Sequence, residues 1–188
     1  MRWVETTSRI RADLARHAGR GGVRAFMRHY ARSPGFRFMV LWRLCGYLRA
    51  RAWGRLTLAP PLALALGHYT YKYGISIPLE VEIGGGFYIG HFGGIVINEH
   101  VTIGENCSLY QGVTIGRHNR GDRKGCPRIG NRVYLAPGCK VFGGIAIGDN
   151  AAVGANAVVT HDVPANAVVV GVSARIISFK GTEGYIRV

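Results

Sequence analysis

The chain has 188 residues, 48% of them hydrophobic, and a formal net charge of +14. The charge is uneven: residues 1–75 contain 14 Arg or Lys against 2 acidic residues, whereas residues 76–188 contain 10 against 8. A basic segment of this kind favours an anionic partner, such as a membrane surface or an acidic substrate. We do not expect nucleic acid as that partner, because no RNA- or DNA-binding motif accompanies the charge.

The cysteines argue against a metal centre. Cys45, Cys107, Cys126 and Cys139 form no CxxC pair, and no histidines have zinc-finger spacing. The simple interpretation is reduced thiols in a cytoplasmic protein. Arg and polar residues are spread through the first 37 positions, so no secretory signal is expected.

Residues 1–73 are predicted to form a basic, aromatic α-helical segment. The stretch WVETTSRIRADLARHAG offers a helix N-cap at residues 6–8 and a stop at Gly19. The stretch SPGFRFMVLWRLCGYLRARAWGRL has apolar residues at helical spacing with arginines between them. The Pro60-Pro61 pair then interrupts any single helix through LTLAPPLALALGHYTYKYG.

The aromatic residues of this segment stand beside arginines, a pattern typical of a helix that lies in a membrane interface. These aromatic residues are Phe36, Phe38, Trp42, Tyr47 and Trp53. The alternative is an amphipathic helix packed on its own domain or on a sister subunit. The apolar runs are too short to span a bilayer, which takes about 20 residues in a helix. The sequence leaves both interpretations open; membrane contact, if it occurs, would be peripheral, at the inner face of the cytoplasmic membrane.

From residue 83 an aliphatic residue recurs every six positions. It falls at positions 83 and 89, then at 97, 103, 109 and 115, and then at 129, 135, 141, 147, 153 and 159. A small residue usually follows it. This hexapeptide repeat predicts a parallel β-helix, in which three short strands complete each triangular coil and the aliphatic residues stack inside. The helical segment can cover one end of the stack, and the last residues can cover the other.

Two steps of the repeat are longer than six, and insertions in a solenoid often build its binding face. The step from 89 to 97 adds two residues around His91, among glycines. The step from 115 to 129 adds a loop over residues 117–128, with five Arg or Lys against Asp122. This loop can grip an anionic ligand, reach a neighbouring subunit, or be merely solvated.

His91 suits general base chemistry. An alcohol is a poor nucleophile at neutral pH, and a positioned imidazole can take its proton as it attacks an electrophile. Backbone N–H groups of Gly90, Gly93 or Gly94 could stabilise the oxyanion. Cys126 could act as a nucleophile instead, although an inert cysteine is the simpler interpretation.

The stretches IGHFGGIVI, VTIGENC, QGVTIG, CPRIGN, LAPGCKVFGGIAIGDNAAVGANAVV and DVPANAVVVGVSARII resemble the hexapeptide-repeat acyltransferases. The nearest resemblance is to serine acetyltransferases and to the O-acetyltransferases of exopolysaccharide and capsule synthesis. It covers residues 74–178 and implies a left-handed β-helix acetyltransferase domain with a protruding loop at 117–128, followed by a C-terminal tail at 179–188. It also implies a homotrimer, acetyl-CoA as co-substrate and active sites between subunits.

The resemblance also implies roles for individual residues. His91 falls on the catalytic histidine of the family, acting by direct transfer. The residues expected to contact acetyl-CoA are Gly116, Arg117, Ala136, Pro137, Gly154, Ala155, Arg175 and Lys180. The residues expected to contact the acceptor are Tyr88, Phe92, Asn98, His118 and Arg128. No metal is expected.

Three positions depart from the pattern of the serine-specific enzymes. Ser76 stands where those enzymes have the Asp that pairs with the catalytic histidine, Gly90 replaces an Asp, and Cys126 replaces a His. A carboxylate from Glu80, Glu82 or Glu99, or a backbone carbonyl, would then have to orient His91.

These departures lead us to predict an acetyl-CoA-dependent O-acetyltransferase that acts on a saccharide hydroxyl in exopolysaccharide or capsule biosynthesis. The alternative is a serine O-acetyltransferase of cysteine biosynthesis. A non-enzymatic β-helical scaffold recruited to an anionic surface is a third hypothesis.

Overall fold

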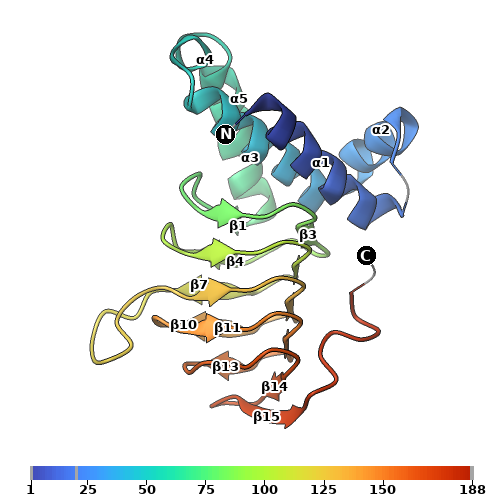
Figure 1. The fold of residues 1–188 in the computed structure, drawn as a ribbon. Coiled ribbons are helices and arrows are strands. Elements are labelled where there is room, and N and C mark those ends of the chain that lie inside the picture. The colour runs from blue at the N-terminus through green and yellow to red at the C-terminus, as the bar shows by residue number, and fades with distance from the viewer. Residues whose placement is uncertain (1, 20, 187–188) are drawn as a thin grey trace.

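A computed structural model describes residues 2–19 and 21–186, and in this part of the chain five helices precede fifteen short strands (Figure 1). The helices are α1 (Trp3–Ala18), α2 (Val23–Arg32), α3 (Pro34–Arg49), α4 (Ala52–Leu56) and α5 (Ala59–Tyr73). The strands are β1 (Ile75–Ser76), β2 (Glu82–Ile83), β3 (Tyr88–Ile89), β4 (Ile95–Ile97), β5 (Thr102–Ile103), β6 (Ser108–Leu109), β7 (Thr114–Gly116), β8 (Arg128–Ile129), β9 (Tyr134–Leu135), β10 (Lys140–Phe142), β11 (Ala146–Ile147), β12 (Ala152–Val153), β13 (Val158–Val159), β14 (Val168–Val170) and β15 (Arg175–Ser178).

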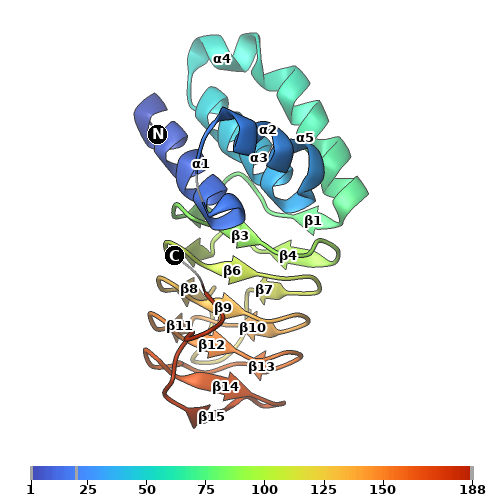
Figure 2. The same ribbon diagram turned by 90° about the vertical axis from the view of Figure 1, so that its right-hand side faces the viewer.

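The strands form a coil with three flat faces, as the hexapeptide repeat predicts. The first sheet has the order β1-β4-β7-β10-β13, the second β2-β5-β8-β11 and the third β3-β6-β9-β12-β14-β15. From β1 to β13, consecutive strands of the chain pass to the next sheet, and strands one coil apart pair in parallel (Figure 2). The prediction of a parallel β-helix is confirmed.

The hexapeptide positions stack inside this coil in three columns. In the second sheet, Ile83 pairs with Ile103, which pairs with Ile129. All twelve positions from 83 to 159 are buried. The burial explains why the repeat is strict: each aliphatic side chain removed from water contributes roughly 1.5–3 kcal/mol, and only an inward-pointing position gains it.

The helices cover the open edge of the first coil (Figure 1). Phe38, Met39 and Trp42 of α3 are buried in the same apolar cluster as the first coil. The Trp42 indole Nε1 donates to the carbonyl oxygens of Ile77 and Pro78, at 3.1 and 3.2 Å. These bonds satisfy groups that the chain would otherwise bury without a partner as it enters the coil.

Helix α1 begins earlier than the sequence predicts. It starts at Trp3, so the predicted N-cap at residues 6–8 lies inside the helix, and that prediction is wrong. The Thr6 hydroxyl donates back to the Arg2 carbonyl at 3.1 Å. The extra turn is held by tertiary packing, because the Trp3 ring lies 5.0 Å from that of Tyr47. Gly19 ends the helix in the left-handed conformation, as predicted.

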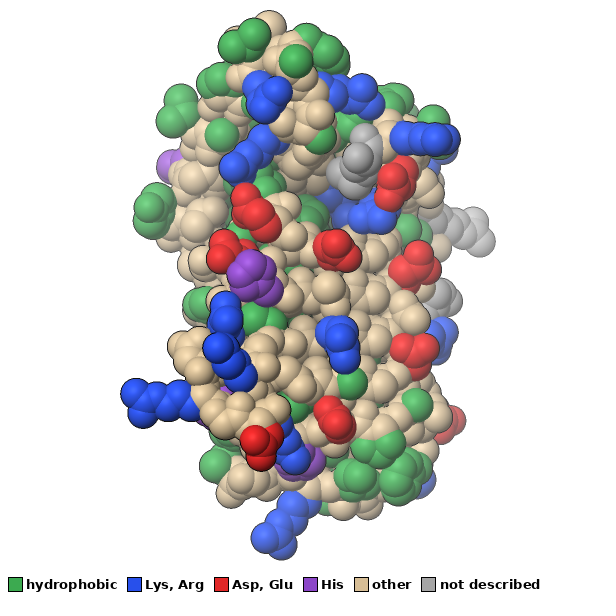
Figure 3. Space-filling model, turned by 60° about the vertical axis from the view of Figure 1, so that its left-hand side comes forward, with side chains coloured by type: hydrophobic (Ala, Val, Ile, Leu, Met, Phe, Trp, Pro, Cys, Tyr) green, Lys and Arg blue, Asp and Glu red, His purple; other side chains and the backbone are tan. Residues whose placement is uncertain are grey.

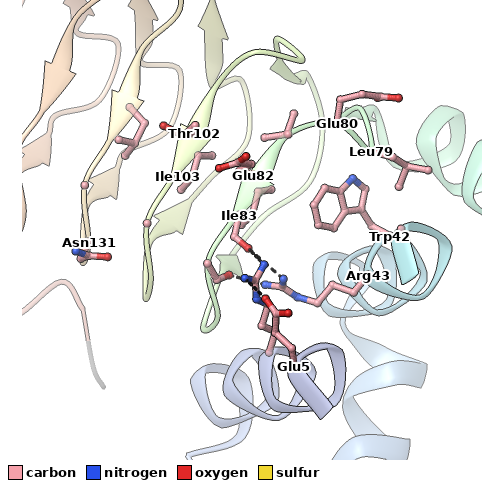
Figure 4. Close-up of a pocket in the computed structure, with 17 residues that line it drawn as sticks. Glu5, Trp42, Arg43, Leu79, Glu80, Glu82, Ile83, Thr102, Ile103 and Asn131 are labelled. Carbon is pink, nitrogen blue, oxygen red and sulfur yellow. Dashed lines mark hydrogen bonds and ion pairs between the residues drawn. The ribbon is translucent and has the colours of Figure 1, made fainter. Parts of the chain in front are cut away.

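A buried ion pair joins α1 to α3 and to the first coil. The Arg43 guanidinium donates to both carboxylate oxygens of Asp13, at 2.6 and 3.0 Å, and to the carbonyl oxygen of Gly84 at 2.6 Å. The Phe87 N–H also donates to Asp13, at 2.9 Å. Figure 4 shows Arg43 reaching from α3 toward Ile83 at the beginning of the coil. Burial raises the pKa of Asp13, and the adjacent guanidinium limits that rise.

Gly35 permits the closest approach of α3 to the coil, which leads to a first prediction. A Cβ on Gly35 would lie 2.5 Å from the Ile89 carbonyl oxygen, so we expect Gly35→Ala to lower the free energy of unfolding by about 1–3 kcal/mol. Gly46 of the same helix is the matched control, because a Cβ there meets nothing within 4 Å. Gly46→Ala is expected to raise stability by about 0.5–1 kcal/mol. Urea unfolding of both variants measures the difference, and equal effects would contradict the close approach.

The last residues do not simply cover the final coil. Strand β15 pairs antiparallel with β14 and covers its free edge. The chain then turns back and climbs along the outside of the stack (Figures 1 and 2). The Gly181 N–H donates to the Asn166 carbonyl at 2.9 Å, and the Tyr185 ring reaches Tyr134 at 4.8 Å.

Among the described residues, no helix is both long and apolar enough to cross a membrane.

Candidate active site

His91 lies exposed at a widened corner of the first coil, between strand β3 of the third sheet and strand β4 of the first sheet. The two residues added to the repeat form this corner. Gly93 and Gly94 have φ values of 110° and 63°, which few other residues adopt. A histidine on the outside of a turn can meet substrate without disturbing the core.

The corner offers two backbone N–H groups to a bound carbonyl. Within the described residues, no hydrogen bond occupies the N–H groups of Gly93 and Gly94. The Gly90 N–H differs, because it donates to the Leu109 carbonyl at 3.0 Å as part of the sheet. Gly90 is therefore not available as an oxyanion donor, because its N–H is already bound.

Four of the predicted acetyl-CoA contacts lie on the same corner as His91, in later coils. The register pairs Ile89 with Leu109, then Leu135, then Val153. The residues that stand two positions after these paired residues therefore form one column along the corner: His91, Gln111, Pro137 and Ala155. Ala136 and Gly154 flank that column. We call it the His91 column.

Arg175 and Lys180 lie at the other end of the stack from His91. Arg175 belongs to β15, which is five strand positions from β3 in the third sheet. At about 4.8 Å between strands, this corresponds to roughly 24 Å. Arg175 and Lys180 are exposed there, so they could contact only the distal end of a long, extended ligand.

The remaining predicted contacts lie along the opposite edge of the first sheet. Asn98 follows β4 and Gly116 ends β7, and these two positions are adjacent, because the Asn98 N–H donates to the Ile115 carbonyl at 2.9 Å. Arg117 and His118 continue from Gly116 into the loop. Arg128 begins the next strand, β8, in the second sheet. A single chain therefore brings these five residues together, but places them across the width of a sheet from His91.

The loop at 117–128 is a closed hairpin that projects from the stack (Figure 1). His118 and Gly125 exchange both backbone hydrogen bonds, at 2.9 and 3.0 Å. The Arg123 guanidinium ties the loop to the Thr160 carbonyl at 2.5 Å. The loop thus presents Arg117 and Arg120, both exposed, from a defined base.

Tyr110, which sequence reasoning missed, lies beside His91, as does the predicted acceptor contact Phe92. The Tyr110 ring lies 6.3 Å from the His91 ring and 5.3 Å from that of Tyr134. The Phe92 ring lies 5.3 Å from that of Tyr73, at the end of α5. Burial, and then the neighbouring Tyr134, raise the pKa of Tyr110 to about 12, so its hydroxyl stays protonated at neutral pH. Tyr110 and Tyr134 carry no motif, so the sequence offered no signal beyond their aromatic character.

Tyr110 also accounts for Gly90. A Cβ on Gly90 would lie 2.4 Å from Cε1 of Tyr110 and 3.0 Å from the Tyr88 ring. An aspartate at this position would therefore displace Tyr110. Gly90 therefore allows the Tyr110 and Tyr88 rings to occupy the space that an aspartate side chain would need.

The carboxylates expected to orient His91 are engaged elsewhere. The Glu80 carboxylate pairs with Arg49 at 3.2 Å, and that of Glu99 lies 3.5 Å from the His100 ring. Glu82 extends from β2 into a cavity of about 740 Å³ on the second sheet (Figure 4). Within the described residues, none of the three forms an ion pair or hydrogen bond with His91.

Cys126 is half-buried, and its environment does not favour a nucleophile. Burial raises the pKa of its thiol, and its Sγ donates to Asn98 Oδ1 at 3.1 Å. A thiolate is the reactive form of cysteine, so a raised pKa lowers its reactivity. The described residues also contain no group of three His, Cys, Asp or Glu side chains placed to hold a metal ion.

The geometry suits proton transfer from a hydroxyl at this exposed corner. His91 is accessible, two N–H groups are free beside it, and the His91 column, flanked by Ala136 and Gly154, leads away from it along one corner. Most backbone groups along this column are already bonded within the coil: the Ala136 N–H donates to the Val153 carbonyl, and the Gly154 N–H donates to the Val169 carbonyl. Among the described residues, no carboxylate contacts His91 to fix the tautomer of its ring.

Comparison with known proteins identifies consistent relatives, although no family model matches the chain. The chain is 36% identical over 150 residues to the serine acetyltransferase of Synechococcus elongatus, covering 80% of this chain and 59% of that protein. It is 37% identical over 145 residues to the serine acetyltransferase of Helicobacter pylori strain J99, covering 77% of this chain and 82% of that protein. The chain thus spans less than two thirds of the first relative.

Solved structures show the same likeness. Serine acetyltransferase from Brucella abortus matches with a TM-score of 0.77 and 29% identity, over 94% of this chain and 70% of that one. Soybean serine acetyltransferase complexed with serine matches with a TM-score of 0.76 and 31% identity, over 93% and 70%. A serine acetyltransferase in complex with CoA matches with a TM-score of 0.73 and 29% identity, over 93% and 71%.

These likenesses confirm the predicted left-handed β-helix and the resemblance to acetyl-CoA-dependent acyltransferases. They contradict the predicted saccharide acceptor and a place in polysaccharide biosynthesis. The relatives and structures are consistently serine acetyltransferases, which was the alternative. The substitutions at Ser76, Gly90 and Cys126 are confined to three positions, whereas the likeness extends over most of the chain.

Proposed function

Because this chain belongs to the serine acetyltransferase family, we propose that it transfers the acetyl group of acetyl-CoA to the hydroxyl of serine. The observation that carries the proposal is His91, exposed beside two free N–H groups at the one corner that the repeat widens by two residues. The likeness to a serine acetyltransferase in complex with CoA supports the donor. The likeness to the soybean enzyme complexed with serine supports the acceptor.

In the proposed reaction His91 acts as general base. The serine Oγ attacks the thioester carbonyl while the His91 imidazole takes the hydroxyl proton. The negative charge that develops on the carbonyl oxygen is stabilised by the N–H groups of Gly93 and Gly94. Collapse of the tetrahedral intermediate breaks the C–S bond, and the proton passes from His91 to the departing CoA thiolate. No acyl-enzyme forms, so Cys126 has no part in the step.

We further propose that two copies of the chain share each site, in a homotrimer. The His91 column lies along one edge of the first sheet, and Asn98, Gly116 and His118 lie along the opposite edge. One chain therefore cannot bring both sets of residues into contact with the same substrate. In the proposed trimer, the edge of a second copy that carries Asn98 and the 117–128 loop lies against the His91 column. The two sets of residues then form one site. The pantetheine arm of CoA then lies along Ala136, Pro137, Gly154 and Ala155, with the cations of the loop near its phosphates.

The acceptor is held differently from the serine-specific pattern. The Tyr110 ring fills the space of the aspartate replaced by Gly90, and Ser76 lies exposed on β1. In the proposal, Tyr88 and Phe92 line the acceptor side beside His91. The Arg128 guanidinium of the neighbouring copy, with its planar fork of donors, suits the carboxylate of serine.

Thiol release from acetyl-CoA tests the proposal directly. We expect the purified full-length chain to release CoA thiol only when serine is present, at about 1–10³ per second. Threonine and homoserine are matched acceptors that add a methyl or a methylene group, and reactions without acceptor measure hydrolysis. A folded protein whose thiol release does not depend on serine would contradict the acceptor. Release that instead requires homoserine or threonine would retain the chemistry of His91 and overturn serine as substrate.

A further inference from the structure

The outer end of the helical bundle carries an apolar surface that the proposed reaction does not use. Trp3, Leu44, Tyr47, Leu48, Trp53, Leu58 and Leu62 line a hollow of about 550 Å³ there. Trp3, Trp53 and Leu58 are about half exposed, and Leu56, between the last two in the chain, is 85% exposed. We call this region the tip surface. Side chains this apolar are normally covered when they form a continuous surface.

The tip surface lies as far from the last coil as the molecule extends. Figure 1 shows α4 and the beginning of α5 at the end of the bundle opposite β15. Figure 3 shows hydrophobic side chains gathered at this end, with Lys and Arg among and below them. A flat partner could reach this end without touching the coils or the His91 corner.

The charge around the tip surface is mostly positive, and the acidic residues at its border are paired, Glu80 with Arg49 at 3.2 Å. No acidic residue occurs in the sequence between Asp13 and Glu80, a stretch that includes the whole of α2 to α5. Arg55 is exposed within α4 itself. The Arg51 guanidinium lies 4.3 Å from the centre of the Tyr47 ring, at the edge of the hollow. The nearest acidic residue on α1, Glu5, is paired with Arg9 at 2.6 Å.

The apolar hollow and the arginines around it together favour one kind of partner over the others. A second copy docked tip to tip would bring two basic surfaces together, which is unfavourable. An acidic protein would match the arginines but not a hollow lined by seven apolar side chains. A bilayer of anionic lipids matches both, because phosphate groups meet the arginines while Trp and Leu side chains enter the boundary between headgroups and acyl chains.

We propose that the tip surface docks the protein on an anionic phospholipid bilayer. Trp53, Leu56 and Leu58 enter the interface, and Arg51 and Arg55 contact lipid phosphates. The protein lies on the membrane and does not cross it, and the coils with His91 project into the solvent. The contact is peripheral and reversible, because both the apolar area and the number of cations are small.

Co-sedimentation with lipid vesicles tests the docking. The full-length protein is mixed with vesicles of phosphatidylcholine alone or with phosphatidylglycerol added. We expect the anionic vesicles to bind it at least about tenfold more tightly, and high salt to weaken that binding. The double variant Trp53→Ser, Leu56→Ser is expected to lose about tenfold or more of the affinity, because it removes the inserted apolar side chains.

Two controls locate the effect. Ile177→Ser with Phe179→Ser removes two exposed apolar side chains, 63% and 64% accessible, near the opposite end of the molecule, and should leave binding unchanged. Trp53→Phe should retain binding but lose most of the change in tryptophan fluorescence on adding anionic vesicles. Retained thermal unfolding shows that the variants are folded.

Three results would overturn the proposal. The first is no binding to anionic vesicles at low salt. The second is binding that the tip variant and the control variant lose equally. The third is self-association that the tip variant abolishes in the absence of vesicle binding, which would make the tip surface a contact between copies. Serine-dependent thiol release is measured without vesicles, so it succeeds or fails independently.

Discussion

Replacing His91 by alanine is expected to lower kcat for acetyl transfer by about 10²–10⁴-fold, the usual contribution of a positioned general base. The serine hydroxyl then has to lose its proton to water as it attacks. The side chain is exposed at a corner, so its loss leaves no cavity in the core and the thermal unfolding transition should not move. Thiol release under saturating serine and acetyl-CoA measures the effect.

His68→Ala is the matched control. His68 is also an exposed histidine, but it lies on α5 in the helical segment, outside both edges of the first sheet that form the proposed site. We expect its kcat to stay within about twofold of the original, as for a surface change away from the reacting atoms. If His91→Ala retained near-normal kcat in a folded protein, the base would have to be another group and the proposed mechanism would fail.

Asp13→Ala is expected to lower the free energy of unfolding by about 3–5 kcal/mol, the largest loss from any single change proposed for this chain. The variant leaves the Arg43 guanidinium buried, with both its carboxylate contacts removed. It also removes the acceptor of the Phe87 N–H, at the beginning of β3. Guanidinium unfolding at neutral pH measures the loss.

Two further variants separate the buried charge from general damage to the core. Asp13→Leu combined with Arg43→Met removes both charges, and should cost much less than Asp13→Ala because no unpaired ion remains. Glu5→Gln breaks the exposed pair with Arg9 and should cost at most about 0.5 kcal/mol. If the double variant were at least as unstable as Asp13→Ala, the loss would come from packing and not from the uncompensated charge.

Several elements of the fold could be predicted because their cause is local in the sequence. A buried position every six residues specifies the strand, the turn and the inward direction at once, so the coil and its twelve core positions follow from the repeat. The interruption at His91 was visible for the same reason: two extra residues cannot be absorbed inside a packed stack, so they must project from it. The start of α1 was mispredicted because a tertiary contact between Trp3 and Tyr47 outweighed the local capping residues.

Which residues lie together in the site could not be predicted from local sequence patterns alone. Pro137 and Ala155 lie on the corner of His91, whereas Asn98 and His118 lie on the opposite edge, because each coil has three corners and only the pairing between coils shows which positions share one. Tyr110 fills the space beside Gly90 through a pairing between residues one coil apart. The acceptor was mispredicted for a related reason: isolated substitutions do not show which neighbouring groups replace the missing contacts.

By itself, then, the sequence determined a β-helix with a helical cover, a basic N-terminal half and one histidine exposed by an interruption in the repeat. Each of these follows from a period or a composition that acts along the chain. The tertiary structure alone decided the buried pair of Asp13 and Arg43, the separation of the predicted contacts into two edges, and the gathering of Trp3, Trp53 and Leu58 on one surface. Those features join side chains far apart in sequence, and their energies exist only once helices and coils have packed together.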